Sequence, residues 1–197
     1  MQKIIFIVYI FFLLPYSTTM ANEEASYDVV HKTDIYEVRY YSDRLVAQVT
    51  NKGDNNSFRK LFNYISGENK NSEKIAMTIP VTQTKKDGEL FMQFYLPSKF
   101  NKETTPIPTN PDLEITTIPE GYFAVIKFSG RSSDKNFEKH NKILKQKLLD
   151  DKIPINGFAV RATYNSPFTL PPLRRNEAMF SIDWKNECLS NTTEFSI

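Results

Sequence analysis

The residues best suited to hold a charged ligand lie between Tyr164 and Glu177, where the sequence is YNSPFTLPPLRRNE. Three prolines fix φ and remove backbone donors, so we expect a stiff, shaped loop rather than a slack connection. Arg174 and Arg175 stand side by side in this loop, and a guanidinium can hold a carboxylate through two parallel hydrogen bonds. The loop is therefore a candidate carboxylate site. The plainer alternative is that both arginines pair with local acids such as Glu177.

Conventional catalytic and metal-binding residues are scarce. The chain has two histidines and one cysteine, which match no zinc-ligand spacing. His31 precedes the first expected strand, and His140 shares the apolar face of an expected helix, where a hydrogen-bonded boundary histidine is the usual role. The sequence contains no G-x-S-x-G elbow, phosphate-binding glycine loop or dinucleotide fingerprint. We therefore expect no catalytic residues and no metal ligands, and favour a binding protein over an enzyme.

The N-terminus has the features of an export signal. An unbroken apolar run from Ile4 to Leu14 is too short to span a membrane, and small residues precede a cleavage point after Ala21. We predict a signal peptide over residues 1–21 and a secreted or periplasmic protein without a stable membrane span; an uncleaved anchor is the alternative. Cys188 is the only cysteine, so no internal disulfide can form.

The remaining residues suit one domain. About 176 residues can bury a sizeable core, which we place at residues 27–184, followed by a polar tail over residues 185–197. A net charge of +2 is too small to indicate nucleic-acid binding. Aromatic residues make up 13% of the chain, which is a rich supply for a core, a cleft or both.

Periodicity predicts two similar runs of elements that would position the loop. The first run comprises strands over residues 35–41 and 45–50, a helix marked by Phe58, Leu61, Phe62 and Ile65, a strand over residues 75–84 interrupted by Pro80, and a strand over residues 90–96. The second comprises strands over residues 113–118 and 122–128, a helix marked by Phe137, Leu144 and Leu148, and strands over residues 157–164 and 177–184. This order indicates an internal duplication and a mostly antiparallel α+β fold, in which a ligand tends to bind where the halves join.

Several motifs, in order along the chain, resemble the SOUL/haem-binding protein family. Residues 36–41 (YEVRYY) are similar to the family's Y-E-x-R opening, and residues 75–82 (IAMTIPVT) resemble its K-I-x-M-T-x-P-V segment. Residues 94–97 (FYLP) match its F-Y-L-P element, and the loop from Tyr164 to Glu177 is its strongest marker. The resemblance covers about residues 27–184.

The resemblance implies both a fold and a function. The fold is α+β, with duplicated halves forming a distorted antiparallel β-barrel of about eight strands and two flanking helices. The function is non-covalent binding of haem or another tetrapyrrole in a hydrophobic cleft, without catalysis. The residues expected to line that cleft lie on the first helix, the strand after it and the proline-rich loop: Arg59, Phe62, Asn63, Met77, Phe168, Leu170 and Arg174.

Two positions differ from the family's pattern. A histidine proposed as an iron ligand in one branch is replaced here by Tyr40. Tyrosinate can ligate haem iron, although an ordinary strand aromatic is the plainer interpretation. A helix position that is lysine in the branch without this histidine is Asn63 here. Both differences should weaken specific ligation and leave apolar burial as the main driving force.

Other functions stay open on the sequence. The fold is similar to the ligand domains of multidrug-sensing regulators, so the cleft could take another hydrophobic or cationic small molecule. A weak enzyme that modifies tetrapyrroles would need an acidic or tyrosine side chain facing the macrocycle centre. The expected partner is a small-molecule tetrapyrrole, with no nucleic acid, and the oligomeric state is open.

Overall fold

The computed structural model describes residues 22–51 and 56–185. The expected signal peptide at residues 1–21, Cys188 and almost the whole polar tail lie outside these residues. Among the helices in the described ranges, none combines the length and the apolar composition needed to cross a membrane.

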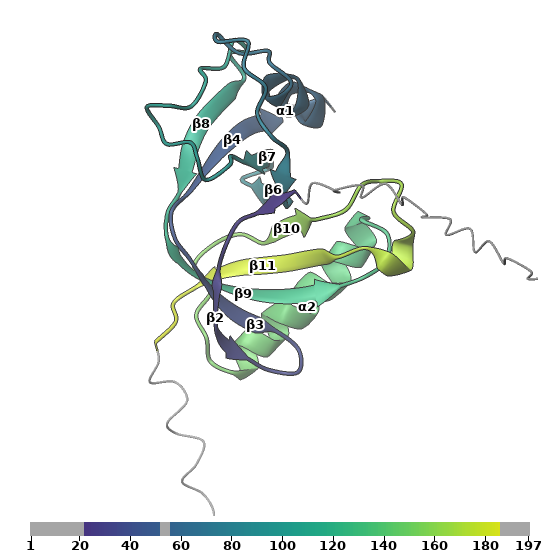
Figure 1. Ribbon diagram of the computed structural model, residues 1–197. Coiled ribbons are helices and arrows are strands. Elements are labelled where there is room, and N and C mark those ends of the chain that lie inside the picture. Colours follow the sequence, from purple (N-terminus) through teal and green to yellow (C-terminus); the bar gives the residue numbers. More distant parts are fainter. Residues whose placement is uncertain (1–21, 52–55, 186–197) are drawn as a thin grey trace, which may run out of the picture.

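A single antiparallel sheet dominates the fold and curls into an open half-barrel with β2 and β8 at its edges (Figure 1). A separate short pairing joins β1 (Glu23–Glu24) in parallel to β5 (Thr78–Ile79). In spatial order the nine strands of the large sheet are β2 (Asp28–Lys32), β3 (Glu37–Tyr41), β9 (Gly121–Phe128), β11 (Asn176–Ile182), β10 (Val160–Thr163), β6 (Val81–Lys86), β7 (Glu89–Tyr95), β4 (Arg44–Asn51) and β8 (Leu113–Ile118).

The order of these strands confirms the duplicated architecture. When β3, β4, β6 and β7 are matched in turn with β8, β9, β10 and β11, the spatial order of the strands is the same read inward from β3 as read inward from β8. The first strand of each half pairs with the other half, since β3 lies beside β9 and β8 lies beside β4. The halves also pair with each other through β6 and β10, near the middle of the sheet, where Gln83 lies opposite Arg161.

Both helices cover the same face of the sheet. The helix α1 (Ser57–Ile65) packs against β4 and β7, and α2 (Asp134–Asp150) packs against β9 and β11. Directly paired residues point to the same side of a sheet, so the register from Val81 through Thr163 to Asn176 connects the two helix-facing surfaces. We call this side the helix face and the other side the open face.

Local sequence explains where the helices start and stop. Ser133 caps α2, because its hydroxyl accepts a hydrogen bond from the Asn136 N–H. Asn56 occupies the N-cap position of α1 but makes no side-chain capping bond. Gly67 has a φ of +113° just after α1, a conformation that favours glycine and that commonly ends a helix.

The N-terminal segment holds more structure than its sequence suggests. The first strand is predicted at residues 35–41, but the chain before it already forms β1 and the edge strand β2. His31 therefore lies on β2 rather than in a connection. Charged and polar residues dominate both strands, so the apolar periodicity that marks a strand is missing there. The predicted interruption at Pro80 is confirmed, because β5 ends before it and β6 begins after it.

Candidate binding cleft between the two halves

A cleft of about 670 Å³ lies on the helix face where the two halves join. A second hollow of about 590 Å³ shares Gln83 and Arg161 with it and extends to Phe137 on α2. The hollows therefore follow one another along the β6–β10 pair, with Gln83 and Arg161 between them. The apolar residues that line the larger cleft come from α1, β5, β6 and β7 and from the segment before β5: Phe58, Met77, Ile79, Val81 and Met92.

The aromatic wall of the cleft is built by α1. Phe58 and Phe62 are four residues apart and therefore share one side of the helix, where their rings stack with centroids 6.2 Å apart and an interplanar angle of 11°. The edge of Phe58 also packs against the buried ring of Phe94, 5.3 Å away. Both helical rings remain about half exposed, at 48% and 49%. They form a supported apolar surface that a flat ligand can cover.

Two arginines line the polar side of the cleft. Arg174 donates from Nε to the Thr169 carbonyl at 2.7 Å and from Nη2 to the Pro167 carbonyl. Arg161, on β10, donates to Asp134 at 2.7 Å, and its guanidinium lies 4.6 Å from the centre of the Phe137 ring. Each guanidinium therefore uses only some of its N–H donors in these contacts. Such an arrangement can accept a ligand carboxylate.

A short helix and several hydrogen bonds give the proline-rich loop a defined shape. Its prolines 171 and 172 begin a short 3₁₀ helix, Pro171–Leu173, and the Pro171 carbonyl accepts a hydrogen bond from the Gly130 N–H at 2.8 Å. The Asn165 side chain accepts the Arg175 N–H at 2.6 Å. These bonds fix both ends of the loop at the rim of the cleft.

The structure brings only some of the predicted site residues together. Met77 and Arg174 line the cleft, and Phe62 stacks on the lining residue Phe58. Arg59 and Asn63 lie exposed on α1. Phe168 and Leu170 are 92% and 66% exposed on the loop beyond the lining residue Pro167. These four do not line the empty protein's cleft, and their part in binding stays a prediction.

Sequence reasoning did not single out Phe58 or Arg161 as binding residues. Phe58 carried a usable signal, because its spacing from Phe62 places both rings on one side of a helix. Arg161 carried none. It lies in a short strand, and only the pairing of β10 with β6 brings it to the join.

The other loop arginine holds the fold together. Arg175 forms a two-point ion pair with Glu24 of β1, with Nη2–Oε1 at 2.8 Å and Nη1–Oε2 at 3.0 Å. Its Nε donates to Glu177 at 3.0 Å, and its guanidinium lies 3.7 Å from the centre of the Tyr164 ring. The alternative of local acid pairing therefore holds for Arg175.

A buried set of charges on the open face extends from this contact. Arg39 is 0% exposed and donates to both carboxylate oxygens of Glu177, at 2.9 and 3.0 Å. It also donates to Glu37 at 2.9 Å, and the Tyr164 hydroxyl donates to Glu177 at 2.6 Å. We call these residues, together with Arg175 and Glu24, the Arg39 network. The Y-E-x-R motif and the loop motif thus meet in the interior.

Ionisation in the Arg39 network follows from these contacts. Burial alone would lower the pKa of Arg39, but the bonds to Glu177 outweigh it and raise the pKa. Burial and the adjacent Glu177 carboxylate raise the pKa of the Tyr164 hydroxyl. Partial burial alone would raise the pKa of Glu37, but hydrogen bonds from Arg39 and Lys127 lower it. The network therefore keeps its arginines and Glu37 charged and its tyrosine neutral at physiological pH.

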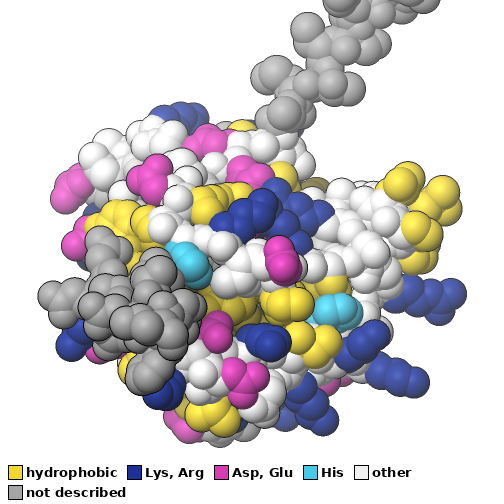
Figure 2. Space-filling model, turned by 90° about the horizontal axis from the view of Figure 1, so that it is seen from below, with side chains coloured by type: hydrophobic (Ala, Val, Ile, Leu, Met, Phe, Trp, Pro, Cys, Tyr) yellow, Lys and Arg dark blue, Asp and Glu magenta, His cyan; other side chains and the backbone are white. Residues whose placement is uncertain are grey.

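Tyr40, at the position of the family's histidine, does not line the cleft, and neither do the two histidines. Tyr40 donates to Glu120 at 2.6 Å and packs against Tyr122, so it behaves as an ordinary strand aromatic. His31 stacks on Trp184, and His140 stacks on Phe128. Histidine side chains lie at two separated places on the surface in Figure 2. In the described part of the chain, no three His, Cys, Asp or Glu side chains gather into a metal site.

Comparison with known proteins gives consistent matches. A family profile described as SOUL heme-binding protein matches residues 22–181. The chain is 29% identical over 182 residues to the mouse protein named heme-binding protein 2, covering 85% of this chain and 87% of that one. It is 30% identical over 166 residues to the human protein of the same name, covering 77% and 79%.

Solved structures share the fold at much lower identity. A hydrolase from Listeria innocua aligns with a TM-score of 0.57 at 10% identity, over 78% of this chain and 94% of that one. The EcmrR C-terminal domain aligns with a TM-score of 0.58 at 11% identity, over 81% and 99%. At such identities the likeness concerns architecture, and the family is established by the profile and the curated relatives. This chain belongs to the SOUL heme-binding protein family.

Proposed function

We propose that the protein binds haem or a related tetrapyrrole non-covalently in the cleft between its halves, as an exported carrier or buffer rather than an enzyme. The observation that carries this proposal is the cleft of about 670 Å³ in a member of this family, with an apolar wall on one side and two arginines on the other. Its size falls in the range of small-molecule sites. Its two kinds of wall suit a flat apolar ring system with carboxylates at its edge.

Different residues of the cleft would contact the apolar ring and the carboxylates of the ligand. The macrocycle would cover Phe58, Met77 and Val81, and its carboxylates would reach Arg174 and Arg161. Burying ~300 Å² of apolar ligand contributes about 7 kcal/mol before the costs of association. These magnitudes limit the apolar contribution to micromolar affinity at best.

Iron should add little to this affinity. The described lining residues include neither histidine nor cysteine. Tyr164 also lines the cleft, but its hydroxyl is buried and bound to Glu177 at 2.6 Å. The sulfurs of Met77 and Met92 are the remaining soft donors, and thioether sulfur is a weak ligand by itself. We therefore expect haemin and metal-free protoporphyrin to bind with dissociation constants within about fivefold of each other, or ~1 kcal/mol.

The test is a titration of the purified protein with haemin and protoporphyrin, followed by Soret absorbance and tryptophan quenching. Phe58→Asp should weaken both ligands at least tenfold, because a carboxylate would replace the ring that forms the wall. Leu149→Asp is the matched control: Leu149 is a 70% exposed apolar residue on α2 outside the cleft, and its replacement should leave binding unchanged. Equal weakening by both variants, or binding without one-to-one stoichiometry, would overturn the cleft assignment.

Export is tested separately from binding. Expression of the whole chain in a secreting host, followed by N-terminal sequencing of the released protein, should give a mature chain that begins after Ala21. Retention of the intact N-terminus inside the cell would contradict export but would not affect the cleft.

A further inference from the structure

Arg44, the first residue of β4, is a buried cation that forms no ion pair with any acid among residues 22–51 and 56–185. Its side chain lies on the open face and is 8% exposed. Its Nε and Nη2 atoms are buried without a hydrogen-bond partner. The ion pairs among the described residues do not include it. Its guanidinium carbon lies instead 4.2, 4.8 and 5.9 Å from the ring centres of Tyr41, Phe123 and Tyr95.

Comparison with Arg39 shows that Arg44 lacks a carboxylate partner among the described residues. Arg39 lies on the same face and is buried too, yet it contacts the carboxylates of both Glu177 and Glu37. A buried arginine without an acid is strongly unfavourable, and the faces of aromatic rings offset only part of that cost. The guanidinium of Arg44 is therefore prepared for an anion that the described residues do not supply.

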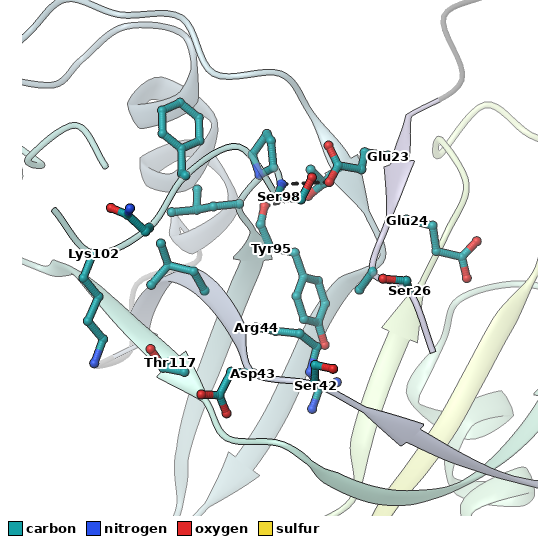
Figure 3. A pocket seen from close by; sticks show the side chains of 17 residues that line it. Glu23, Glu24, Ser26, Ser42, Asp43, Arg44, Tyr95, Ser98, Lys102 and Thr117 are labelled. Atoms are coloured by element: carbon teal, nitrogen blue, oxygen red, sulfur yellow. Dashed lines mark hydrogen bonds between the residues drawn. The ribbon is translucent and has the colours of Figure 1, made fainter. Parts of the chain in front are cut away.

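A pocket of about 390 Å³ opens beside Arg44, between β1, the start of β4, the end of β8 and the segment after β7. Arg44, Tyr95 and Ser42 lie close together in it (Figure 3). The pocket offers hydroxyl groups from Ser26, Ser42 and Thr117, and apolar surface from Leu45, Leu96 and Phe100. It shares no lining residue with the cleft, so it forms a second site.

The three acids that line this pocket already have partners. Glu23 accepts the Ser98 N–H at 2.8 Å, and Asp43 accepts the Glu120 N–H at 2.7 Å. Glu24 is paired with Arg175. Their charges nevertheless bear on the ligand, because a second negative charge on it would be repelled. A monoanion is favoured over a phosphate dianion for this reason.

We propose that this pocket binds a small monocarboxylate whose carboxylate pairs with Arg44 and whose apolar remainder packs against Leu45, Leu96 and Phe100. The planar guanidinium matches a carboxylate through two parallel bonds. Nε and Nη2 are buried in the free protein, so this pairing requires the guanidinium to turn toward the pocket. The ligand class is thus set by one buried cation, a limited volume and surrounding negative charge.

The experiment titrates the protein with sodium benzoate and follows the Arg44 Nε–H signal by ¹⁵N NMR. Benzoate should shift this signal saturably, while benzamide, which has nearly the same shape and no charge, should bind at least tenfold more weakly. Sodium phosphate at the same ionic strength should also bind at least tenfold more weakly. An unshifted Arg44 signal, or equal binding of benzamide or phosphate, would overturn the proposal.

Variants separate the pocket from the fold and from the cleft. Arg44→Met should abolish saturable benzoate binding, and it should fold because it replaces an unpaired buried cation with an apolar chain of similar length. Lys102→Met, at a lining position on the segment after β7, should change the benzoate dissociation constant less than threefold. Phe58→Asp, in the cleft, should leave benzoate binding unchanged. Benzoate binding that survives in Arg44→Met would contradict the assignment, whatever haemin does.

Discussion

Arg39 and the two arginines of the cleft lie on opposite faces of the sheet and are used in opposite ways. On the open face, Arg39 is fully buried and makes four hydrogen bonds to two carboxylates. On the helix face, Arg161 and Arg174 line a cleft and are held by one or two contacts each. A saturated, buried arginine stabilises one arrangement of the chain, whereas a partly used arginine beside a cavity remains available to a ligand.

This difference changes the meaning of the motifs that mark the family. Glu37 and Arg39 of the Y-E-x-R opening, and Arg175 and Glu177 of the loop, contact one another in the interior. Only Arg174 of the loop pair lines the cleft. The most recognisable residues therefore mainly define the fold, while less distinctive ones, such as Phe58 and Arg161, shape the cleft.

The largest expected effect comes from breaking the Arg39 network. Glu177→Gln leaves Arg39 without its main counter-ion and should lower the free energy of unfolding by about 3–5 kcal/mol, measured by urea denaturation. The folded fraction should still bind haemin with unchanged affinity. Asp112→Asn removes an exposed ion pair with Lys60 and should change the free energy of unfolding by less than about 1 kcal/mol. A loss below about 1 kcal/mol in Glu177→Gln would mean that the buried Arg39–Glu177 pair contributes no more to stability than an exposed ion pair.

A smaller change within the same network tests its tyrosine. Tyr164→Phe keeps the ring beneath Arg175 and removes the hydroxyl that donates to Glu177 at 2.6 Å. We expect a loss of about 1.5–3 kcal/mol in the free energy of unfolding, because the hydrogen bond goes to a charged group. Tyr122→Phe, on β9, serves as a control and should change the free energy of unfolding by less than 0.5 kcal/mol. Equal changes in the free energy of unfolding for the two substitutions would show that the Tyr164 hydroxyl bond to Glu177 adds nothing to stability.

The reciprocal test removes a cleft arginine. Arg174→Met should weaken haemin binding about fivefold, or ~1 kcal/mol, by deleting a partner for a ligand carboxylate. The free energy of unfolding should change by less than it does in Tyr164→Phe. Haemin dimethyl ester, which has no free carboxylate, should bind the parent and the variant equally. Discrimination of the ester by Arg174→Met would show that the arginine acts on the loop rather than on the ligand.

Acidification should give the smallest effect and act on the open face. The pKa of Glu37 is lowered in the folded protein from its ordinary value of 4.5. The contribution of Glu37 to stability is therefore complete above the unfolded pKa and is lost as the pH falls through the folded pKa. Glu37→Gln should flatten this acid part of the stability curve below about pH 4.5, in unfolding measured from pH 7 to pH 2. A parallel shift of the whole curve, with no change in slope, would exclude this carboxylate as the titrating group.

The sequence predicted the elements best where apolar periodicity was strong. The strand Leu113–Ile118 and the helix Ser57–Ile65 form close to where the pattern places them. The strand Asp28–Lys32 carries mainly charged and exposed residues at a sheet edge, so no periodic apolar signal exists for it. Of the residues predicted to line the cleft, Met77 and Arg174 do line it. Phe168 and Leu170 are instead exposed on the loop beside it.

By itself, the sequence determined the duplicated order of elements, the rigid loop and the family. These depend on residues close together in the chain, such as prolines that fix φ and apolar side chains at helical or strand spacing. Only the tertiary structure decided which arginine serves which purpose. Arg39 and Glu177 are 138 residues apart in the chain, and strand pairing across the two halves brings them into contact. The partner of each buried charge is therefore chosen by the topology of the sheet, and Arg44 is left with a pocket in place of an acid for the same reason.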